Sequence, residues 1–474
     1  MSDSVLTRSR WLALVIVCLG NLMIVLDVTI VGVALPSIRE DLGFTESSLA
    51  WVANVYLLTF GGFLLLAGRL GDLYGHRRLF LTGIAVFTLA SLGCGLATSP
   101  AALITARGVQ GLGAAIVSAV ALSLVVTSFP EPGERARAMG VFGFVAAGGG
   151  SIGVLLGGVM TDLLNWHWIF LVNVPIGGAV FALSRVVLPG TAGQTRQRPD
   201  VAGAVIVTSS LALAVFAVVN GNQVGWTSPR TLGLLAAAGA LFAWFVRFET
   251  RAATPLVPLR LFRLRNLSIA NVVGVLWAAA MFAWFFLSAL YLQLVLGYRP
   301  LEVGLAFLPA NLIMAVLSVG LSARLVMRFG IRATLVTGLL LAGAGLAVFG
   351  RAPVDGGLVD VLPAMVLLGL GAGMAFNPLL LAAMKDVDET EAGLASGIVN
   401  TSFMMGGALG LAVLASIAAA RTASSDEAPA AALTSGYHAA FLVGALFAVG
   451  AAILSAALPT TTTETSEELE LATV

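Results

Sequence analysis

Residues 51–98 read WVANVYLLTFGGFLLLAGRLGDLYGHRRLFLTGIAVFTLASLGCGLAT, two apolar runs separated by a short charged turn. Each run is about 20 residues long, which is the length that an α-helix needs to cross the hydrocarbon core of a bilayer. The turn contains Arg69, Asp72, Arg77 and Arg78. This stretch therefore predicts two transmembrane helices joined by a charged loop at one membrane surface.

The rest of the chain has the same character. Of its 474 residues, 59% are hydrophobic and 10% are charged, whereas soluble domains contain roughly 25% charged residues. No soluble fold could bury so much apolar surface, so the composition predicts an all-α integral membrane protein. The net charge of +1 argues against nucleic acid as a partner, and the lipid bilayer is the expected surrounding.

Fourteen apolar runs are long enough to cross a bilayer. They cover residues 11–36, 48–71, 79–98, 101–128, 137–160, 166–189, 201–220, 231–248, 267–296, 303–327, 332–350, 358–384, 393–420 and 437–458. The first run contains Asp27 and continues to Pro36 without a small-residue cleavage site. It is therefore expected to be a retained span and not a signal peptide.

The basic residues set the expected orientation. With the N-terminus inside, 19 of the 25 Lys and Arg residues face the cytoplasm, five face outward, and Arg107 lies within a span. This asymmetry predicts that both termini are cytoplasmic. The bias toward arginine over lysine and toward alanine suggests a GC-rich bacterial genome, and therefore a bacterial inner membrane.

Two echoes in the sequence indicate an internal repeat. The turn around Gly75 resembles residues 324–332 around Gly330, and the glycines of the fifth span match those of the thirteenth at a similar offset. The expected domains are a six-helix bundle at 1–189, an inserted helix pair with a basic connector at 190–266, a second bundle at 267–458 and a disordered acidic tail at 459–474. Repeated halves around a midplane site are typical of secondary transporters.

Asp27 and Arg107 are the residues most directly suggestive of chemistry. A carboxylate in the middle of a span is costly, so Asp27 is a functional candidate by default. Burial favours its protonated form and a nearby cation favours its ionised form, so it could take up and release a proton. Arg107 requires an anion or carbonyl partners, and Asp27 is the only clearly mid-membrane acid available. The alternatives are a structural carboxylate and a packing arginine.

Two helix faces are candidates for a substrate cavity. Gln110 and Ser118 share a face with Arg107 by helical spacing. In the ninth span, aromatic residues that could bind a lipophilic cation by cation–π contact recur on one face, and helix packing is an equally good explanation. On this face we expect Trp277, Met281, Trp284 and Tyr291 to line the cavity.

Glycine and charge patterns suggest a seam and a gate. In the fifth span, Gly149, Gly153, Gly157 and Gly158 would let another helix approach closely, and packing alone explains them. We call these four residues the glycine seam. The charged turn could anchor topology or act as an ion-pair latch on the cytoplasmic side. The expected gate residues are Gly68, Arg69, Asp72, Gly75, Arg77 and Arg78.

Other common sites are missing from the sequence. Cys18 and Cys94 both lie in apolar runs, and the three histidines are too scattered for a metal site. Lys385, the single lysine, is not in a phosphate-binding loop, and common hydrolase motifs are absent. We therefore expect no metal, no cofactor and no enzymatic activity.

Four segments resemble the fourteen-helix drug:proton antiporter family of the major facilitator superfamily. Residues 68–78 are similar to its loop 2–3 motif, residues 26–36 to its first-helix motif, residues 107–111 to its fourth-helix arginine motif and residues 166–177 to the start of its sixth helix. The resemblance covers nearly the whole chain. Val154 stands where the family's fifth-helix motif usually has proline.

The resemblance implies a proton-coupled efflux transporter that exports amphiphilic drugs or lipophilic monovalent cations by alternating access. Its partners would be a small-molecule substrate and protons, and the chain is expected to be monomeric. Two alternatives remain. One is a dedicated exporter of a single endogenous secondary metabolite or lipid, and the other is a non-transporting membrane sensor or scaffold.

Overall fold

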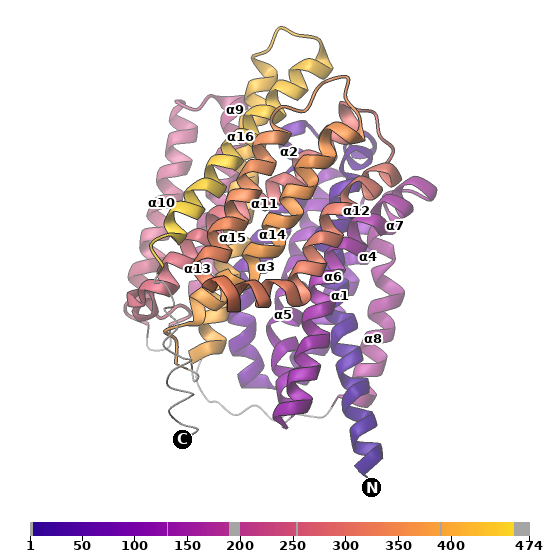
Figure 1. The fold of residues 1–474 in the computed structure, drawn as a ribbon, viewed down its shortest axis with the longest axis vertical. Coiled ribbons are helices and arrows are strands. Elements are labelled where there is room, and N and C mark those ends of the chain that lie inside the picture. Colours follow the sequence, from indigo (N-terminus) through magenta and orange to yellow (C-terminus); the bar gives the residue numbers. More distant parts are fainter. Residues whose placement is uncertain (1–2, 130, 189–199, 253–254, 389–390, 459–474) are drawn as a thin grey trace.

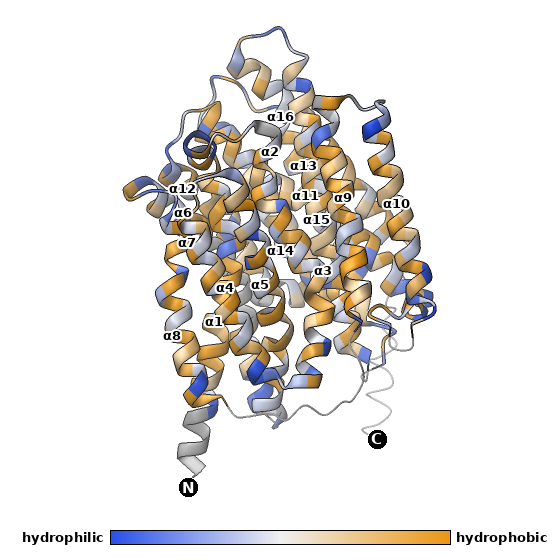
Figure 2. Ribbon diagram, turned by 180° about the vertical axis from the view of Figure 1, so that it is seen from behind, coloured by the Kyte–Doolittle hydropathy of each residue, from blue (hydrophilic) through white to orange (hydrophobic). Residues whose placement is uncertain are grey.

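The computed structural model describes residues 3–129, 131–188, 200–252, 255–388 and 391–458, and in this part of the chain all regular structure is helical. Long helices run side by side between the two ends of one elongated bundle (Figure 1). Hydrophobic residues cover their length and hydrophilic residues collect near the ends (Figure 2). The predicted all-α fold is confirmed for the described residues.

The helices of the first half and of the inserted pair follow the predicted apolar runs closely. They are α1 (Asp3–Leu42), α2 (Glu46–Leu49), α3 (Trp51–Tyr74), α4 (His76–Gly95), α5 (Pro100–Ser128), α6 (Pro132–Leu163), α7 (Trp168–Leu171), α8 (Asn173–Val187), α9 (Val201–Val224) and α10 (Pro229–Glu249). Helix α1 continues through Pro36 to Leu42, beyond its predicted end.

The second half begins with a short 3₁₀ turn. Its elements are η1 (Leu259–Arg263), α11 (Arg265–Leu294), α12 (Pro300–Val316), the π-helical turn η2 (Leu317–Leu321), α13 (Ser322–Phe349), α14 (Leu358–Met384), α15 (Ala392–Ala423) and α16 (Pro429–Ser455). Helix α16 begins eight residues before the predicted start at 437, because Pro429 at its first turn has the fixed φ that suits a helix start.

Twelve stretches among the described residues are long and apolar enough to cross a membrane. Ile152–Leu163 of α6 and Pro300–Val316 of α12 are shorter apolar helices and do not meet that criterion. The count of fourteen spans therefore stays a prediction. The predicted acidic tail at 459–474 lies outside the described residues.

Two sets of helices pack closely among themselves. In the first set, α1 packs on α5 and α6, and α5 packs on α3 and α4. In the second set, α11 packs on α14, α15 and α16, and α13 packs on α14 and α16. The sets meet where α6 contacts α12 and where α3 contacts α15, and α9 lies against both α3 and α15. The division into two bundles and an inserted pair stays a prediction with which this packing agrees.

The sequence echoes correspond to equivalent local structures. Gly75 and Gly330 both adopt positive φ, at 90° and 82°, a conformation that favours glycine. Gly330 bends α13, which is otherwise continuous across the loop predicted near 328–331. Gly153 packs against α1, and Gly410, its sequence match, packs against Ala279 of α11. Each glycine thus lets its helix approach the first long helix of its own set.

Candidate functional site

Asp27 and Arg107 meet in the interior, as the sequence predicts. Asp27 of α1 is 0% exposed and Arg107 of α5 is 1% exposed. The Arg107 Nη1 atom lies 2.5 Å from Asp27 Oδ2, and Arg107 Nε donates to the carbonyl of Val52 at 3.0 Å. The guanidinium also lies over the Tyr56 ring, 4.2 Å from its centroid. A buried arginine thus has an anion, a carbonyl and an aromatic face as partners.

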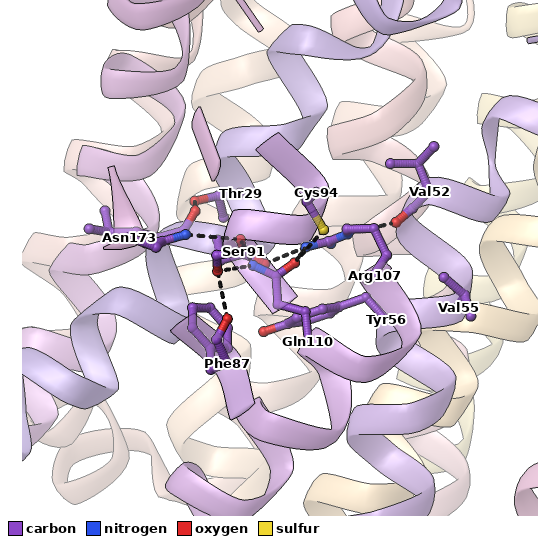
Figure 3. A network of polar contacts seen from close by, with 12 residues as sticks. Thr29, Val52, Val55, Tyr56, Phe87, Ser91, Cys94, Arg107, Gln110 and Asn173 are labelled. Carbon is purple, nitrogen blue, oxygen red and sulfur yellow. Dashed lines mark hydrogen bonds and ion pairs between the residues drawn. The ribbon is translucent and has the colours of Figure 1, made fainter. Parts of the chain in front are cut away.

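Gln110 joins the ion pair to a third helix. Its Nε2 donates to Asp27 Oδ1 at 2.7 Å and to Ser91 Oγ of α4 at 2.8 Å. Its Oε1 accepts from Arg107 Nη1 at 2.7 Å. The Ser91 hydroxyl in turn donates to the Phe87 carbonyl (Figure 3). Both ends of the Gln110 amide are therefore used, which fixes its orientation.

Asn173, at the start of α8, is the last member of a polar cluster around Asp27. We call this cluster the Asp27 network; it consists of Asp27, Tyr56, Ser91, Arg107, Gln110 and Asn173. Its Asn173 Nδ2 atom lies 3.4 Å from Asp27 Oδ1. Groups from α5 and α8 thus bind the carboxylate of α1, while Val52 and Tyr56 of α3 contact Arg107 and Ser91 of α4 contacts Gln110 (Figure 3). Arg107 is the eighth residue of α5, about 10 Å along the helix from its first residue by helical rise. The network therefore lies nearer the end of the bundle at which α5 begins.

The sequence predicts the pairing of Asp27 with Arg107 and places Gln110 on the same face of α5 as a cavity candidate, but it does not indicate that Ser91, Asn173 or Tyr56 belongs to this network. Ser91 and Asn173 are single polar residues in apolar runs, and nothing in their spacing indicates which helix they face. Asn173 lies in the segment that resembles the family's sixth helix, which was the one signal available.

The predicted cavity residues occupy different surroundings. Ser118 is half-buried on α5, while Trp277 and Trp284 are each 1% exposed within the second set. Tyr291 is fully buried, and its hydroxyl donates to the Pro353 carbonyl at 2.7 Å. Met281 is half-buried against the same core. A substrate role for these residues stays a prediction.

The glycine seam contacts two helices. A Cβ on Gly149 would lie 3.0 Å from Val25 of α1, and one on Gly157 would lie 2.6 Å from the Ile30 carbonyl oxygen. Gly158 faces α12, where a Cβ would lie 2.6 Å from the Pro300 carbonyl oxygen. The seam therefore brings α6 close to α1 within the first set and to α12 of the second set.

We expect Gly157→Ala to destabilise the protein, because its methyl group would meet backbone rather than a flexible side chain. Overpacking of this kind costs about 1–3 kcal/mol. Gly150→Ala is the matched control, since its Cβ would lie 3.8 Å from Thr29 in ordinary contact. Thermal unfolding in detergent should show a lower midpoint for Gly157→Ala alone. Equal midpoints for the two variants would contradict this interpretation of the seam.

The predicted gate turn contains one carboxylate–imidazole contact within the turn and one contact to α8. Asp72 is exposed and its Oδ1 lies 3.4 Å from His76 Nε2, a partner that sequence reasoning did not assign. Arg77 donates to the carbonyl of Arg185 in the last turn of α8. Gly75 turns the chain between α3 and α4. The gating role of these residues and of Gly68, Arg69 and Arg78 stays a prediction.

A polar contact joins the two sets at the end of the bundle opposite the gate turn. Arg299, immediately before α12, forms an ion pair with Asp162 of α6, and its Nε lies 3.1 Å from Asp162 Oδ1. Gly304 of α12 lies close to the α6 backbone at Val154. The ion pair thus links the start of α12 to the last turn of α6.

Comparison with known proteins gives consistent matches. The family profile of the Major Facilitator Superfamily matches residues 17–411. The cephamycin export protein CmcT of Amycolatopsis lactamdurans is 41% identical over 96% of this chain and 93% of its own length. The puromycin resistance protein pur8 of Streptomyces alboniger is 38% identical, over 95% and 90% respectively. The multidrug resistance protein Stp of Mycobacterium tuberculosis is 38% identical, over 88% and 77%.

A solved structure shares the fold. The nucleoside transporter NupG superposes with a TM-score of 0.66 over 95% of this chain and 99% of its own, at 12% sequence identity. At that identity the likeness concerns the fold alone. The profile match and the relatives carry the assignment, and they agree with the resemblance found in the sequence motifs: this chain is a multi-pass membrane transporter that belongs to the major facilitator superfamily.

Proposed function

We propose that the protein is a proton-coupled exporter of amphiphilic antibiotics or drugs that works by alternating access. The observation that carries the proposal is the fully buried Asp27, held by Arg107, Gln110 and Asn173. A carboxylate enclosed in this way is a natural proton carrier, because protonation removes the charge and weakens its hold on Arg107. Each proton that enters the cell releases about 2.3 kcal/mol per 100 mV of membrane potential.

The proposed topology has fourteen spans with both termini in the cytoplasm of a bacterium, in the inner membrane. Helix α6 has 32 residues and would be about 48 Å long. Helix α12 and the turn η2 together run without a break from Pro300 to Leu321. Both would reach across a hydrocarbon core of about 30 Å. In this topology residues 1–189 and 267–458 are the two moving bundles, and the chain works as a monomer.

The names of the relatives support export. CmcT is named for the export of cephamycin, pur8 for resistance to puromycin and Stp for multidrug resistance. Two of these names refer to a single antibiotic, which favours the second candidate, a dedicated exporter of one endogenous compound. A narrow spectrum in the assay below would select that candidate, whereas several unrelated substrates would select multidrug export.

The direct test uses inverted membrane vesicles that contain the protein. With an acidic interior, the outward flow of protons should drive cephamycin, puromycin or a lipophilic dye into the vesicles. A protonophore should abolish the uptake. Uptake that is unaffected by collapse of the gradient would exclude proton coupling, and a lack of uptake for every compound would favour a sensor or scaffold.

Substrate charge gives a further prediction. Asp27 is already paired with Arg107, and each uncompensated ion in a low-dielectric site costs several kcal/mol. A neutral molecule avoids that cost. A monovalent cation meets it once where a dication meets it twice, and contact with the aromatic face of Trp277 and Trp284 could offset part of it. We expect mono-quaternary compounds to compete better than bis-quaternary compounds of similar size. Equal or tighter handling of the dication would show that another acid, such as Asp162 or Glu302, reaches the cavity.

The proposed cytoplasmic gate also gives a measurable effect. We expect Asp72→Ala to slow turnover several-fold with little change in the Michaelis constant, because the turn between α3 and α4 lies far from the Asp27 network. Substrate-dependent initial rates in the vesicle assay separate the two parameters. A weakened affinity at normal turnover would argue against a gating role.

A further inference from the structure

Two acidic side chains meet where the predicted inserted pair joins the connector to α11. Asp200 precedes α9, and its Oδ1 accepts from the Gly203 amide at 2.8 Å. Glu249 is the last residue of α10, and its Oε2 accepts from the Val257 amide at 3.0 Å. Glu249 is only 3% exposed. One oxygen of each carboxyl group is therefore occupied by a backbone donor.

The other two oxygens converge on the same point. Asp200 Oδ2 and Glu249 Oε1 each lie 2.6 Å from the position that a Cβ on Gly203 would occupy. Both atoms are buried, and neither has a hydrogen-bond partner among the described residues. Two ionised carboxylates whose oxygens both lie this close to one point repel each other, whereas a single proton shared between them makes a strong O–H···O hydrogen bond.

The surrounding charges do not compensate for a double negative charge. Arg247 and Arg251 flank Glu249 in sequence, and Arg263 lies on η1. Within the described ranges, none of these arginines forms an ion pair with either acid. Arg260 of η1 pairs with Glu391, just before α15, instead.

The donors at this site also select the ligand. The amides of Gly203 and Val257 point their N–H groups at the two carboxyl groups. Each donor occupies one oxygen of its carboxyl group, so only Asp200 Oδ2 and Glu249 Oε1 are left for a ligand, whereas a metal cation would need several further oxygen ligands. A proton needs only the two oxygens that already face each other.

From this arrangement we propose that Asp200 and Glu249 share one proton, and so form a second protonation site separate from the Asp27 network. A hydrogen bond through the shared proton would link the start of α9 to the end of α10. Because Glu249 also accepts from the Val257 amide, the same site holds the connector that leads into α11. The proposal does not depend on transport or on the role of Asp27.

Helix α9, which begins at this site, contacts helices of both sets. Thr208 of α9 packs against Gly62 of α3, and the Ser416 hydroxyl of α15 donates to the Val218 carbonyl at 3.2 Å. The Ser210 hydroxyl donates to the Ala238 carbonyl of α10 at 2.9 Å. Helix α9 thus contacts both sets of helices, and loss of the proton would loosen the start of α9 from the end of α10 and from the connector that leads into α11.

The test is infrared spectroscopy of the purified full-length protein in lipid nanodiscs. The wild type should show a carbonyl band of a protonated carboxyl group at neutral pH that shifts in D₂O and disappears as the pH rises. Glu249→Gln and Asp200→Asn should each remove that band. Asp27→Asn should leave it, and Glu427→Gln, which changes an exposed acid, should have no effect.

Glu249→Gln and Asp200→Asn are both used so that the test does not depend on one variant that fails to fold. Thermal unfolding shows whether each of them is folded. Loss of the same band in both folded variants supports the proposal. A wild type without such a band, or a band that persists in both variants, would overturn it. A band that appears only when Na⁺ is withdrawn would also overturn it, because a cation would then occupy the site.

Discussion

Replacing Asp27 with asparagine is expected to abolish proton-driven export while the protein stays folded and inserted in the membrane. Asparagine has nearly the same shape and can still accept from Gln110 and Asn173, but it cannot bind and release a proton. Gradient-driven uptake into inverted vesicles should fall to the level of empty vesicles, a loss of at least two orders of magnitude if the carboxylate is the coupling group.

Glu40→Gln is the matched control, because Glu40 is an exposed acid near the end of the same helix. This variant should keep its uptake and pH dependence. Substrate exchange without a gradient separates coupling from binding, since Asp27→Asn could still exchange substrate. Full uptake by Asp27→Asn with an unchanged pH profile would show that Asp27 is not the coupling site.

Arg107→Ala should lose both transport and stability. Removing one partner of a buried ion pair leaves an uncompensated charge and typically costs about 3–5 kcal/mol. The substitution also leaves the Val52 carbonyl without the Arg107 Nε donor and removes the contact with the Tyr56 ring. Arg107→Lys should recover transport only weakly, because a lysine cannot reach Asp27, Gln110 and Val52 in one planar arrangement.

The double variant Asp27→Asn with Arg107→Ala distinguishes charge from packing. It should be more stable than Arg107→Ala alone, because no buried carboxylate is left unpaired. Thermal unfolding measures this difference, and vesicle uptake should stay absent in both. If Arg107→Ala and Arg107→Lys both transport normally, Arg107 is a packing residue.

The sequence predicted the pairing of Asp27 with Arg107 because charged side chains inside membrane spans are costly and therefore rare. One acid in the middle of a span and one arginine inside another have few partners other than each other. Helical spacing placed Gln110 on the Arg107 face as a cavity candidate, but it did not predict the hydrogen bonds of its amide to Asp27 and Arg107. Ser91 and Asn173 could not be predicted, since a single small polar residue in an apolar run does not reveal which neighbouring helix it faces.

Helix boundaries and partners at the surface were less predictable. The tenth span was expected at 303–327, but α12 ends at Val316 in a π-helical turn whose position no residue type announces. An ion-pair latch was one expectation for the charged turn, and the side chain that contacts Asp72 among the described residues is His76, the first residue of α4. Asp200 and Glu249 are far apart in sequence and each lies at a helix end, where an acid is unremarkable.

We propose that proton movement and substrate export are two parts of one cycle that passes through Asp27. The most direct measurement follows the pH inside proteoliposomes after an antibiotic substrate is added on one side, with no imposed gradient. We expect substrate movement to drive protons in the opposite direction in the wild type and in Glu40→Gln, and not in Asp27→Asn. Substrate movement without any proton movement in the wild type, or normal proton movement in Asp27→Asn, would contradict it.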